Sequence, residues 1–288
     1  MTTLALPRIL VIGASGMLGA PVTRALVEAG FTVKTLAHGA GKPIAGTTSV
    51  QGDVFDRESL VSAMRDTDGV YLNLGIPVSA RETDRLTERE GIANALAAAQ
   101  TAGVRRVAML SPLFKAYQGT RGHDSWVLRT KLAAERALME SPVPWTVFRA
   151  SSFYENLEGG MRRGDKVSIM GKHWRPQRYL AAKDYGSLVA AALATEDSAR
   201  QVLVAQGPEA MNLEALGRRY VAARTREKLE VQKAPLGVMK FVGLFSRELG
   251  AVTKMMVALD DYEEPNDAAA TWARYGAPTM TVEQFAAR

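Results

Sequence analysis

The sequence predicts an α/β protein with a Rossmann-type, doubly wound parallel sheet and a smaller, mostly helical C-terminal substrate lobe. Two observations lead to this fold class. Short apolar, β-branched segments alternate with longer helical segments over the first half of the chain, which is typical of right-handed βαβ units. In addition, the glycine-rich stretch GASGMLG at residues 13–19 stands at the first change from strand to helix, where such sheets bind dinucleotides.

The expected strands are short, apolar and rich in β-branched or aromatic residues. They cover residues 8–12, 31–37, 48–52, 69–74, 106–111 and 145–150. The helices expected between them cover residues 17–29, 56–64, 84–101 and 125–140. Asp56 is a good N-cap for the second of these helices, and Gly103 is a plausible glycine just after the third.

The alternation of strands and helices loosens after Ala150. Residues 178–182 and 201–205 are expected as short strands around a helix at 183–194, and the chain from Asn212 is mostly helical with one strand at 229–233. We therefore expect a dinucleotide-binding domain at residues 1–155 and a substrate lobe at 156–288, with 176–206 returning to the sheet. Ligands bind beyond the carboxyl ends of the strands in such folds, so the lobe should supply the substrate pocket.

Composition excludes several kinds of chemistry. The 288 residues include no cysteine, which rules out disulfides, thiolate nucleophiles and cysteine-based metal centres, and the three histidines lack metal-ligand spacing, so no metal is expected. The net charge is +6 and the pI about 9.5. Because the basic residues are spread along the chain, we favour a solvated basic surface over nucleic-acid binding.

Nothing in the sequence predicts export or insertion into a membrane. Residues 1–7 lack the basic segment and apolar core of a signal peptide. The longest apolar region, residues 234–259, is interrupted by Lys240, Arg247, Glu248 and Lys254 and cannot span a bilayer. A cytoplasmic protein is expected; an oligomer is possible, but its state is not readable from the sequence.

The stretch at residues 13–19 has the chemistry of a phosphate-binding loop. Gly13 makes the tight turn, Gly16 lets the backbone approach a pyrophosphate, and Gly19 lets the helix pack closely on the strand. The free amides at the start of the helix then face the anion. The residues expected to bind the cofactor here are Gly13, Ser15, Gly16, Met17, Leu18 and Gly19. The alternative is a glycine-rich turn that binds no ligand.

The end of the second strand bears on the choice between NAD and NADP. An NAD site usually places a carboxylate there, on the ribose 2′-hydroxyl. This strand ends at Ala37 and His38 instead, so His38, with Lys42 nearby, could meet the 2′-phosphate of NADP, which we favour over NAD. The alternative for His38 is a solvated loop histidine. Asp53 and Val54 follow the third strand and could reach the adenine, unless Asp53 is only a turn residue.

Stretches along the chain match a known family in the right order. They are residues 13–19 (GASGMLG), 52–56 (GDVFD), 131–138 (KLAAERAL) and 145–156 (WTVFRASSFYEN). With them the chain resembles the NmrA-like group of atypical short-chain dehydrogenase/reductases, kin of isoflavone reductases and NAD(P)H quinone reductases. The last stretch is similar to the family segment T-x-x-R-P-x-x-F-x-E-N, with Ala150 in place of the proline. The group's second strand commonly ends in arginine, where this chain has His38.

The resemblance implies catalytic roles for Ser111 and Lys131. Short-chain reductases commonly use serine, tyrosine and lysine, with the tyrosine four residues before the lysine. Ser111 and Lys131 match the serine and the lysine, but Val127 stands at the tyrosine position, so the usual proton relay is absent. By analogy with relatives of isoflavone reductase type, Lys131 would bind the nicotinamide ribose and act as acid or base. The alternative is an exposed pair between Lys131 and Glu135.

Other residues are placed at the site by the strand ends that precede them. Tyr117 and Tyr154, after the fifth and sixth strands, are candidate phenol donors. Asn73, Leu74 and Gly75 are expected to cover the cofactor ribose, and Ala150, Ser151 and Phe153 to flank the nicotinamide. The apolar candidates for a substrate pocket are Phe153, Tyr154, Met161, Trp174, Met239, Phe241, Phe245 and Met255.

Together these features predict an NADPH-dependent oxidoreductase that transfers a hydride to a small carbonyl, quinone or enone. The substrate is expected to be apolar or aromatic. A hydrolase is excluded because no G-x-S-x-G elbow occurs and Pro112 follows Ser111. The alternative function is a non-catalytic redox sensor that binds NAD(P)H and acts through a protein partner.

Overall fold

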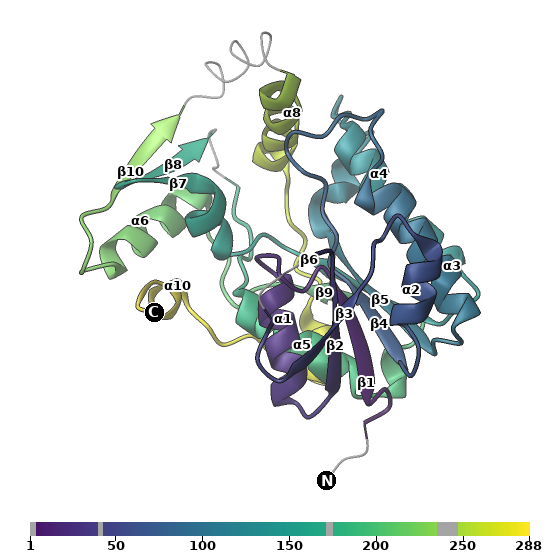
Figure 1. The fold of residues 1–288 in the computed structure, drawn as a ribbon. Coiled ribbons are helices and arrows are strands. Elements are labelled where there is room, and N and C mark those ends of the chain that lie inside the picture. The colour runs from purple at the N-terminus through teal and green to yellow at the C-terminus, as the bar shows by residue number, and fades with distance from the viewer. Residues whose placement is uncertain (1–3, 40–42, 171–174, 235–246) are drawn as a thin grey trace.

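A seven-stranded sheet forms the centre of the computed structural model, which describes residues 4–39, 43–170, 175–234 and 247–288 (Figure 1). The strand order is β3-β2-β1-β4-β5-β6-β9, and every pairing in it is parallel. The chain leaves β1 for β2 and β3 on one side and returns to β4, β5 and β6 on the other. This reversal places a ligand crevice beyond the ends of β1 and β4, and it confirms the expected doubly wound fold.

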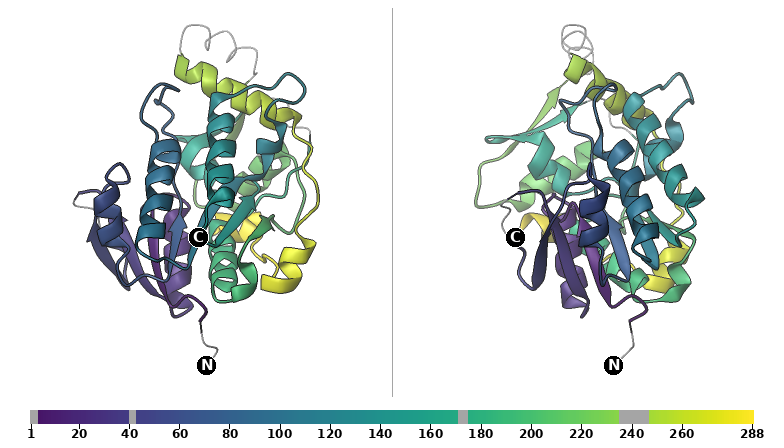
Figure 2. Two further views of the ribbon diagram at one scale, coloured as in Figure 1. Left: turned by 90° about the vertical axis from the view of Figure 1, so that its right-hand side faces the viewer. Right: turned by 45° about the vertical axis from the view of Figure 1, so that its right-hand side comes forward.

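The bounds of the elements follow the expected alternation closely. The strands of the large sheet are β1 (Arg8–Ile12), β2 (Thr32–Ala37), β3 (Thr47–Gln51), β4 (Gly69–Leu72), β5 (Arg106–Pro112), β6 (Trp145–Ala150) and β9 (Gln201–Ala205). Helices α1 (Gly19–Glu28) and α5 (Ala182–Leu193) cover one face, and α2 (Arg57–Ala63), α3 (Ile92–Thr101) and α4 (Trp126–Glu140) cover the other (Figures 1 and 2).

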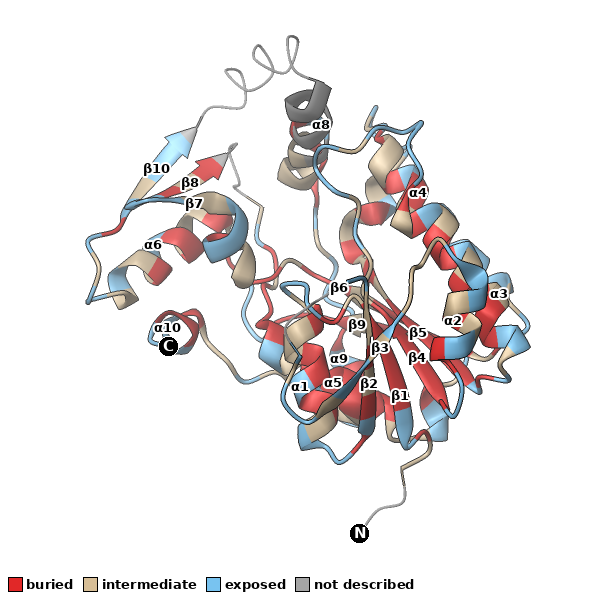
Figure 3. Cartoon of the chain, in the orientation of Figure 1, coloured by how far each residue is buried: buried red, intermediate tan, exposed pale blue. Residues whose placement is uncertain are grey.

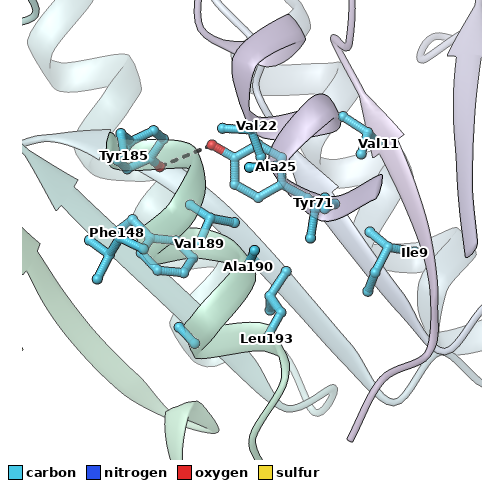
Figure 4. Close-up of a cluster of buried hydrophobic side chains, with 14 of the residues drawn as sticks. Ile9, Val11, Val22, Ala25, Tyr71, Phe148, Tyr185, Val189, Ala190 and Leu193 are labelled. Carbon is cyan, nitrogen blue, oxygen red and sulfur yellow. Dashed lines mark hydrogen bonds between the residues drawn. The ribbon is translucent and has the colours of Figure 1, made fainter. Parts of the chain in front are cut away.

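Both faces are buried at the centre of the sheet, which explains why β1, β4, β5 and β6 are mostly apolar, whereas the edge strand β3 is polar and has no buried residue (Figure 3). Alternate residues of β1 point to opposite layers: Ile9 packs with α1 and α5, and Leu10 with α2 and α3. Under α5 the hydroxyls of Tyr71 and Tyr185 lie 2.9 Å apart and satisfy one another (Figure 4). Tyr185 also meets the edge of Phe148, so this tyrosine pair ties β4 and β6 to α5.

Helix starts follow local chemistry where a capping side chain is available. Asp56 accepts hydrogen bonds from the amides of Glu58 and Ser59 and caps α2, as predicted. The single helix expected at 84–101 is different: a π-helical turn, η1 (Thr87–Gly91), comes first, and α3 begins only at Ile92. π-turns frequently occur at functional sites, and this one lies at the carboxyl edge of the sheet.

The lobe contains a small sheet that was only partly expected. Its strand order is β10-β8-β7, and helices α6 and α10 accompany it. Their bounds are β7 (Arg162–Arg163), β8 (Lys166–Met170), β10 (Glu230–Ala234), α6 (Leu213–Ala223) and α10 (Val282–Ala286). The predicted strand at 178–182 is wrong. Only isolated bridges, such as Phe153 with Leu180, form there, and both carboxylate oxygens of Glu155 accept the Ala182 amide at the start of α5.

The chain passes between the sheet and the lobe more than once. It enters the lobe after β6, comes back for α5 and β9, and leaves again for α6. Helix α8 (Arg247–Asp261) leads to α9 (Ala269–Tyr275), which packs on α5 and β9, and α10 returns to the lobe (Figure 2). Short helical turns are η2 (Leu113–Tyr117), η3 (Leu157–Met161) and η4 (Glu196–Ser198). None of the helices in the described ranges is long and apolar enough to cross a membrane.

Candidate active site

The glycine-rich loop is held so closely that two of its positions admit only glycine. Gly13 has φ +87°, and a Cβ there would lie 2.2 Å from the carbonyl oxygen of Asn73. A Cβ at Gly19 would lie 2.0 Å from the carbonyl oxygen of Gly13. Gly16 is under no such constraint, because a Cβ there would be 3.4 Å from the nearest atom. Its predicted role, close approach to a pyrophosphate, concerns the ligand and stays a prediction.

The start of α1 is a candidate site for an anion. Leu18, at the N-cap position, makes no side-chain capping bond, and the first turn of α1 carries no acidic residue. Ser15, Gly16 and Met17 are exposed. The Ala20 amide donates to the Gly16 carbonyl oxygen, and Pro21 has no amide hydrogen. A helix start without a capping side chain, at the positive end of the helix dipole, favours phosphate oxygens.

A cavity of about 430 Å³ opens beside this loop, within the size range of small-molecule sites. The lining residues come from the ends of β1, β2, β3 and β4 and from η1. They include the predicted Gly13, Ser15, His38, Asp53, Val54 and Leu74, together with Phe55 and Thr87. The structure therefore brings together the predicted residues of the cofactor's adenosine half.

His38 and Asp53 face each other at the mouth of this cavity. The distance from His38 Nδ1 to Asp53 Oδ2 is 3.9 Å, and the His38 side chain is 83% exposed. Asp53 also shapes its own turn, because its Oδ1 accepts a hydrogen bond from the amide of Phe55 (2.8 Å). Asp53 is therefore a turn residue, as one of the two alternatives had it, and its contact with the adenine stays a prediction. Lys42, considered with His38, lies outside the described residues.

Lys131 lies at the inner end of the crevice and is paired with a residue that was not anticipated. Its Nζ donates a hydrogen bond to Glu88 Oε1 at 2.5 Å. The alternative pairing with Glu135 is wrong, since Glu135 turns toward the sheet. The other oxygen of Glu88, Oε2, is buried and has no hydrogen-bond partner among the residues described. A buried carboxylate oxygen without a donor is unfavourable, so Glu88 is suited to accept a hydrogen bond from a ligand.

Ser111 belongs to a buried cluster of charged side chains. Its Oγ accepts a hydrogen bond from Lys115 Nζ (3.1 Å), and Lys115 forms an ion pair with Glu135. Arg149 donates to the same carboxylate, with Nη2 2.6 Å from Glu135 Oε1. The Lys115 and Glu135 side chains are each 5% exposed.

Burial and pairing oppose each other in this cluster. Burial lowers the pKa of Lys115, and the nearby carboxylate of Glu135 only partly offsets it. Burial also acts to raise the pKa of Glu135, but hydrogen bonds from Arg149, Lys115 and Ser111 outweigh it, so the pKa of this carboxyl is held below its ordinary value.

Two features of the sequence could have pointed to this cluster. Lys115 is a charge within the otherwise apolar segment LFKAY, and Glu135 shares the inner face of α4 with Leu128 and Leu138. Neither pattern names the partner, which comes from the contact between α4, η2 and β6.

The two parts of the crevice share a wall. Leu74 lines the large cavity and also a small one of about 10 Å³, whose other walls include Glu88, Ser111 and Lys131. Asn73 contacts the glycine-rich loop, because its Nδ2 donates to the carbonyl oxygen of Gly13 (3.4 Å). The predicted Gly75 is exposed beside them.

The residues expected to flank the nicotinamide are largely packed away. Ala150 and Phe153 are buried in the core, and the Phe153 ring meets the edge of Tyr185 at 5.4 Å. The Ser151 hydroxyl donates to Glu264 Oε2 (2.6 Å).

The two candidate phenols lie in different surroundings. Tyr154 is fully buried in the lobe core, where burial raises its pKa to about 12, so it is closed to a substrate. Tyr117 ends η2, and its hydroxyl accepts a hydrogen bond from the Glu263 amide (3.0 Å) while its ring packs on Tyr262.

Part of the expected substrate wall can be located. Met161 packs against the lobe core. Trp174, Met239, Phe241, Phe245 and the side chain of Met255 lie outside what the structure describes. Met17 is 46% exposed, and its sulfur is 3.1 Å from the point where a Cβ on Gly159 would lie, so the loop touches the lobe there. In the described part of the chain, no cluster of three or more acidic or histidine side chains is arranged to hold a metal ion.

Comparison with known proteins places this site in a family. Residues 13–196 match the model of the NAD(P)H-binding family. Because the match spans more than half of the 288 residues, the chain belongs to that family.

Two curated relatives carry different names. One is a (4-alkanoyl-5-oxo-2,5-dihydrofuran-3-yl)methyl phosphate reductase from Streptomyces griseus, 30% identical over 209 residues that cover 70% of this chain and 69% of the relative. The other is the photosystem II assembly factor Ycf39 of Synechocystis, 24% identical over 252 residues that cover 83% of this chain and 74% of that protein.

A solved structure supports the fold. Pinoresinol-lariciresinol and phenylcoumaran benzylic ether reductases, described with their relationship to isoflavone reductases, give a TM-score of 0.75 at 16% identity, over 98% of both chains. This likeness shows that the fold is shared. Together with the family match at residues 13–196, it agrees with the expected resemblance to NmrA-like and isoflavone reductase-type proteins.

Proposed function

We propose that this protein is an NADPH-dependent reductase that transfers a hydride to a small carbonyl, quinone or enone. The observation that carries the proposal is that two cavities share Leu74 as a wall. The larger one is bounded by the glycine loop, and the smaller one is lined by Glu88, Ser111 and Lys131. When bound, the nicotinamide supplies the hydride. The chain supplies the binding, the orientation and the proton.

The residues present fit a dinucleotide. The uncapped start of α1 accepts the pyrophosphate, and the 430 Å³ cavity takes the adenosine half. Preference for NADPH over NADH is proposed because the end of β2 carries His38 and no carboxylate. Asp53 lies across from His38, and its proposed contact is with the adenine rather than with the 2′-phosphate.

The proposed roles of Lys131 and Ser111 follow from their places in the crevice. Lys131, held by Glu88, binds the nicotinamide ribose through its ammonium group. Ser111 donates a hydrogen bond to the substrate oxygen that gains negative charge as the hydride arrives. Tyr117 is the alternative donor.

An apolar, conjugated substrate is proposed from the exposed Met17 beside the lobe and from the Streptomyces relative, whose name describes an unsaturated oxo-dihydrofuran. The test is oxidation of NADPH, followed by absorbance, with a panel of quinones, enones and aromatic aldehydes. We expect turnover with at least one class, and a large loss of rate for Lys131→Ala. If wild-type protein saturated with NADPH oxidises it with none of the acceptors, the proposal is overturned.

A second candidate is an NAD(P)H-binding sensor that acts through a protein partner. Val127 at the usual tyrosine position and the similarity to an assembly factor favour it. Tight NADPH binding without turnover across the whole panel would support this candidate. Turnover at rates typical of enzymes would argue against the sensor function.

A further inference from the structure

We infer that Lys115 is the proton source of this site and delivers its proton to the substrate through the Ser111 hydroxyl. The inference rests on the proposed reductase function and names the group that replaces the missing tyrosine. It assigns a chemical role to a buried side chain that the hydride-transfer site, as built from Lys131 and Ser111, does not use.

Lys115 lies within hydrogen-bond distance of Ser111. It lies in η2, one short turn beyond the end of β5, so its Nζ reaches Ser111 Oγ at 3.1 Å. Both side chains are buried. Ser111 also lines the small cavity that contains Lys131 and Glu88. The serine therefore stands between the buried lysine and the place where Lys131 would hold the nicotinamide ribose.

The cluster contains one more cation than carboxylate. Lys115 and Arg149 share the single carboxylate of Glu135, and Lys115 is the buried cation, at 5% exposed against 35% for Arg149. Arginine does not release its proton in proteins, so the labile proton is the one on Lys115. Burial lowers the pKa of Lys115 toward the range in which a lysine can act as an acid.

The proposed step is balanced as follows. A hydride leaves the reduced nicotinamide for the carbonyl carbon, and the carbon–oxygen π electrons move to the oxygen. That oxygen takes the proton of the Ser111 hydroxyl, which rotates toward it from the cluster, while Ser111 Oγ takes a proton from the Lys115 ammonium. The products are an alcohol, oxidised cofactor and neutral Lys115. Water entering after product release returns the proton through Ser111.

The test exploits the different basicity of two products. Reduction of a ketone or aldehyde forms an alkoxide that must be protonated, whereas a hydroquinone oxygen is a much weaker base and leaves without help. The informative variant is Lys115→Arg, which keeps the charge beside Glu135 but cannot give up a proton. Lys183→Arg, on the exposed side of α5, is the matched control. Thermal unfolding and calorimetric NADPH binding of each variant show that fold and cofactor site remain.

We expect Lys115→Arg to lose about 100-fold or more in kcat for an aldehyde, within the range of general acid catalysis, and to change little for a quinone. Wild-type aldehyde reduction should fall as the pH rises above the pKa of Lys115, and the variant should lack that alkaline limb. Ser111→Ala should lose activity with both substrates, because it also removes the hydrogen bond to the substrate oxygen, whereas Tyr117→Phe should leave the ratio of aldehyde to quinone turnover unchanged.

Two results would overturn the inference while leaving the reductase proposal intact. One is an equal effect of Lys115→Arg on both substrate classes with the alkaline limb retained. The other is a selective loss in Tyr117→Phe instead. If wild-type protein turns over quinones alone, no alkoxide is protonated and the inference fails. If it turns over nothing, the reductase proposal itself fails.

Discussion

The two ends of the proposed cofactor site differ in the groups that form them: backbone at one end and charged side chains at the other. The end proposed for the adenosine half is built on a backbone loop: Gly13 and Gly19 admit no Cβ, the helix start is uncapped, and a cavity of about 430 Å³ opens beside it. The end proposed for the nicotinamide consists of charged side chains, most of them buried. Lys131 is paired with Glu88, and Ser111 belongs to the cluster with Lys115, Glu135 and Arg149.

This difference indicates whether a substitution at each end should change the stability of the protein or its affinity for the cofactor. A backbone site is preformed, and a change there acts through space and through the ligand. A buried charged cluster contributes to the fold as well as to chemistry, because each charge that loses its partner stays desolvated. Substitutions in the buried cluster around Glu135 should therefore disturb stability, and those at the mouth of the large cavity, such as at His38, should mainly change affinity.

The largest effect is expected for Glu135→Gln. It leaves Lys115 and Arg149 without their shared carboxylate, and removal of one partner from a buried ion pair costs about 3–5 kcal/mol in the free energy of unfolding. Denaturant unfolding measures it, with Glu140→Gln on the exposed end of the same helix as control. A loss no greater than that of the control would show that the cluster is not held as described.

The same carboxylate should make stability depend on pH. Because the folded pKa of Glu135 lies below its ordinary value, its contribution is fully present above the unfolded-state pKa, about 4.3, and is lost as the pH falls through the folded pKa. Wild-type protein should therefore lose more stability on acidification than Glu135→Gln does. Parallel curves of unfolding free energy against pH would contradict this.

The next effect is expected for Gly13→Ala. A side chain at φ +87° is strained, and its Cβ would lie 2.2 Å from the Asn73 carbonyl oxygen, so the loop must move. We expect a loss of about 2 kcal/mol in unfolding free energy and NADPH affinity at least tenfold weaker. Gly160→Ala, where a Cβ would meet open space, is the control. Unchanged affinity in Gly13→Ala would mean that the loop does not bind the cofactor.

A smaller effect is expected for Glu88→Gln. This substitution removes the negative charge that pairs with Lys131, and it changes the carboxylate whose Oε2 is buried without a partner into an amide. NADPH affinity should fall about tenfold, or about 1.4 kcal/mol. Affinity for 2′,5′-ADP, which carries only the adenosine half, should stay the same. Equal weakening of both ligands would place the effect in the fold rather than at the nicotinamide end.

The smallest effect is expected for His38→Asp. It places a carboxylate at the end of β2, where NAD-binding proteins usually carry one. The ratio of NADPH to NADH affinity should fall about fivefold, or about 1 kcal/mol, with stability unchanged because His38 is 83% exposed. An unaltered ratio would show that His38 does not meet the 2′-phosphate.

The same contrast explains what the sequence could predict. Glycine spacing and strand periodicity are local patterns, so the loop, the strands of the large sheet and the N-cap Asp56 were predictable. Pairings between distant elements were not. Glu88 meets Lys131 because the π-turn η1 approaches α4, and Glu135 turns inward only because β6 presents Arg149 to it. The small sheet of the lobe joins β8 to β10, far apart in sequence, and β8 alternates over only five residues, with Val167 and Ile169 buried.

The central claim is that the two ends bind one dinucleotide, with Lys131 on its nicotinamide ribose. The most direct measurement is calorimetric titration of wild-type protein and Lys131→Ala with NADPH and NADH. We predict that wild-type protein binds NADPH at least tenfold more tightly than NADH, a gap of about 1.4 kcal/mol, and that the variant binds NADPH more weakly. Absence of binding by either cofactor to the wild-type protein would contradict the account of the site and of its proposed function.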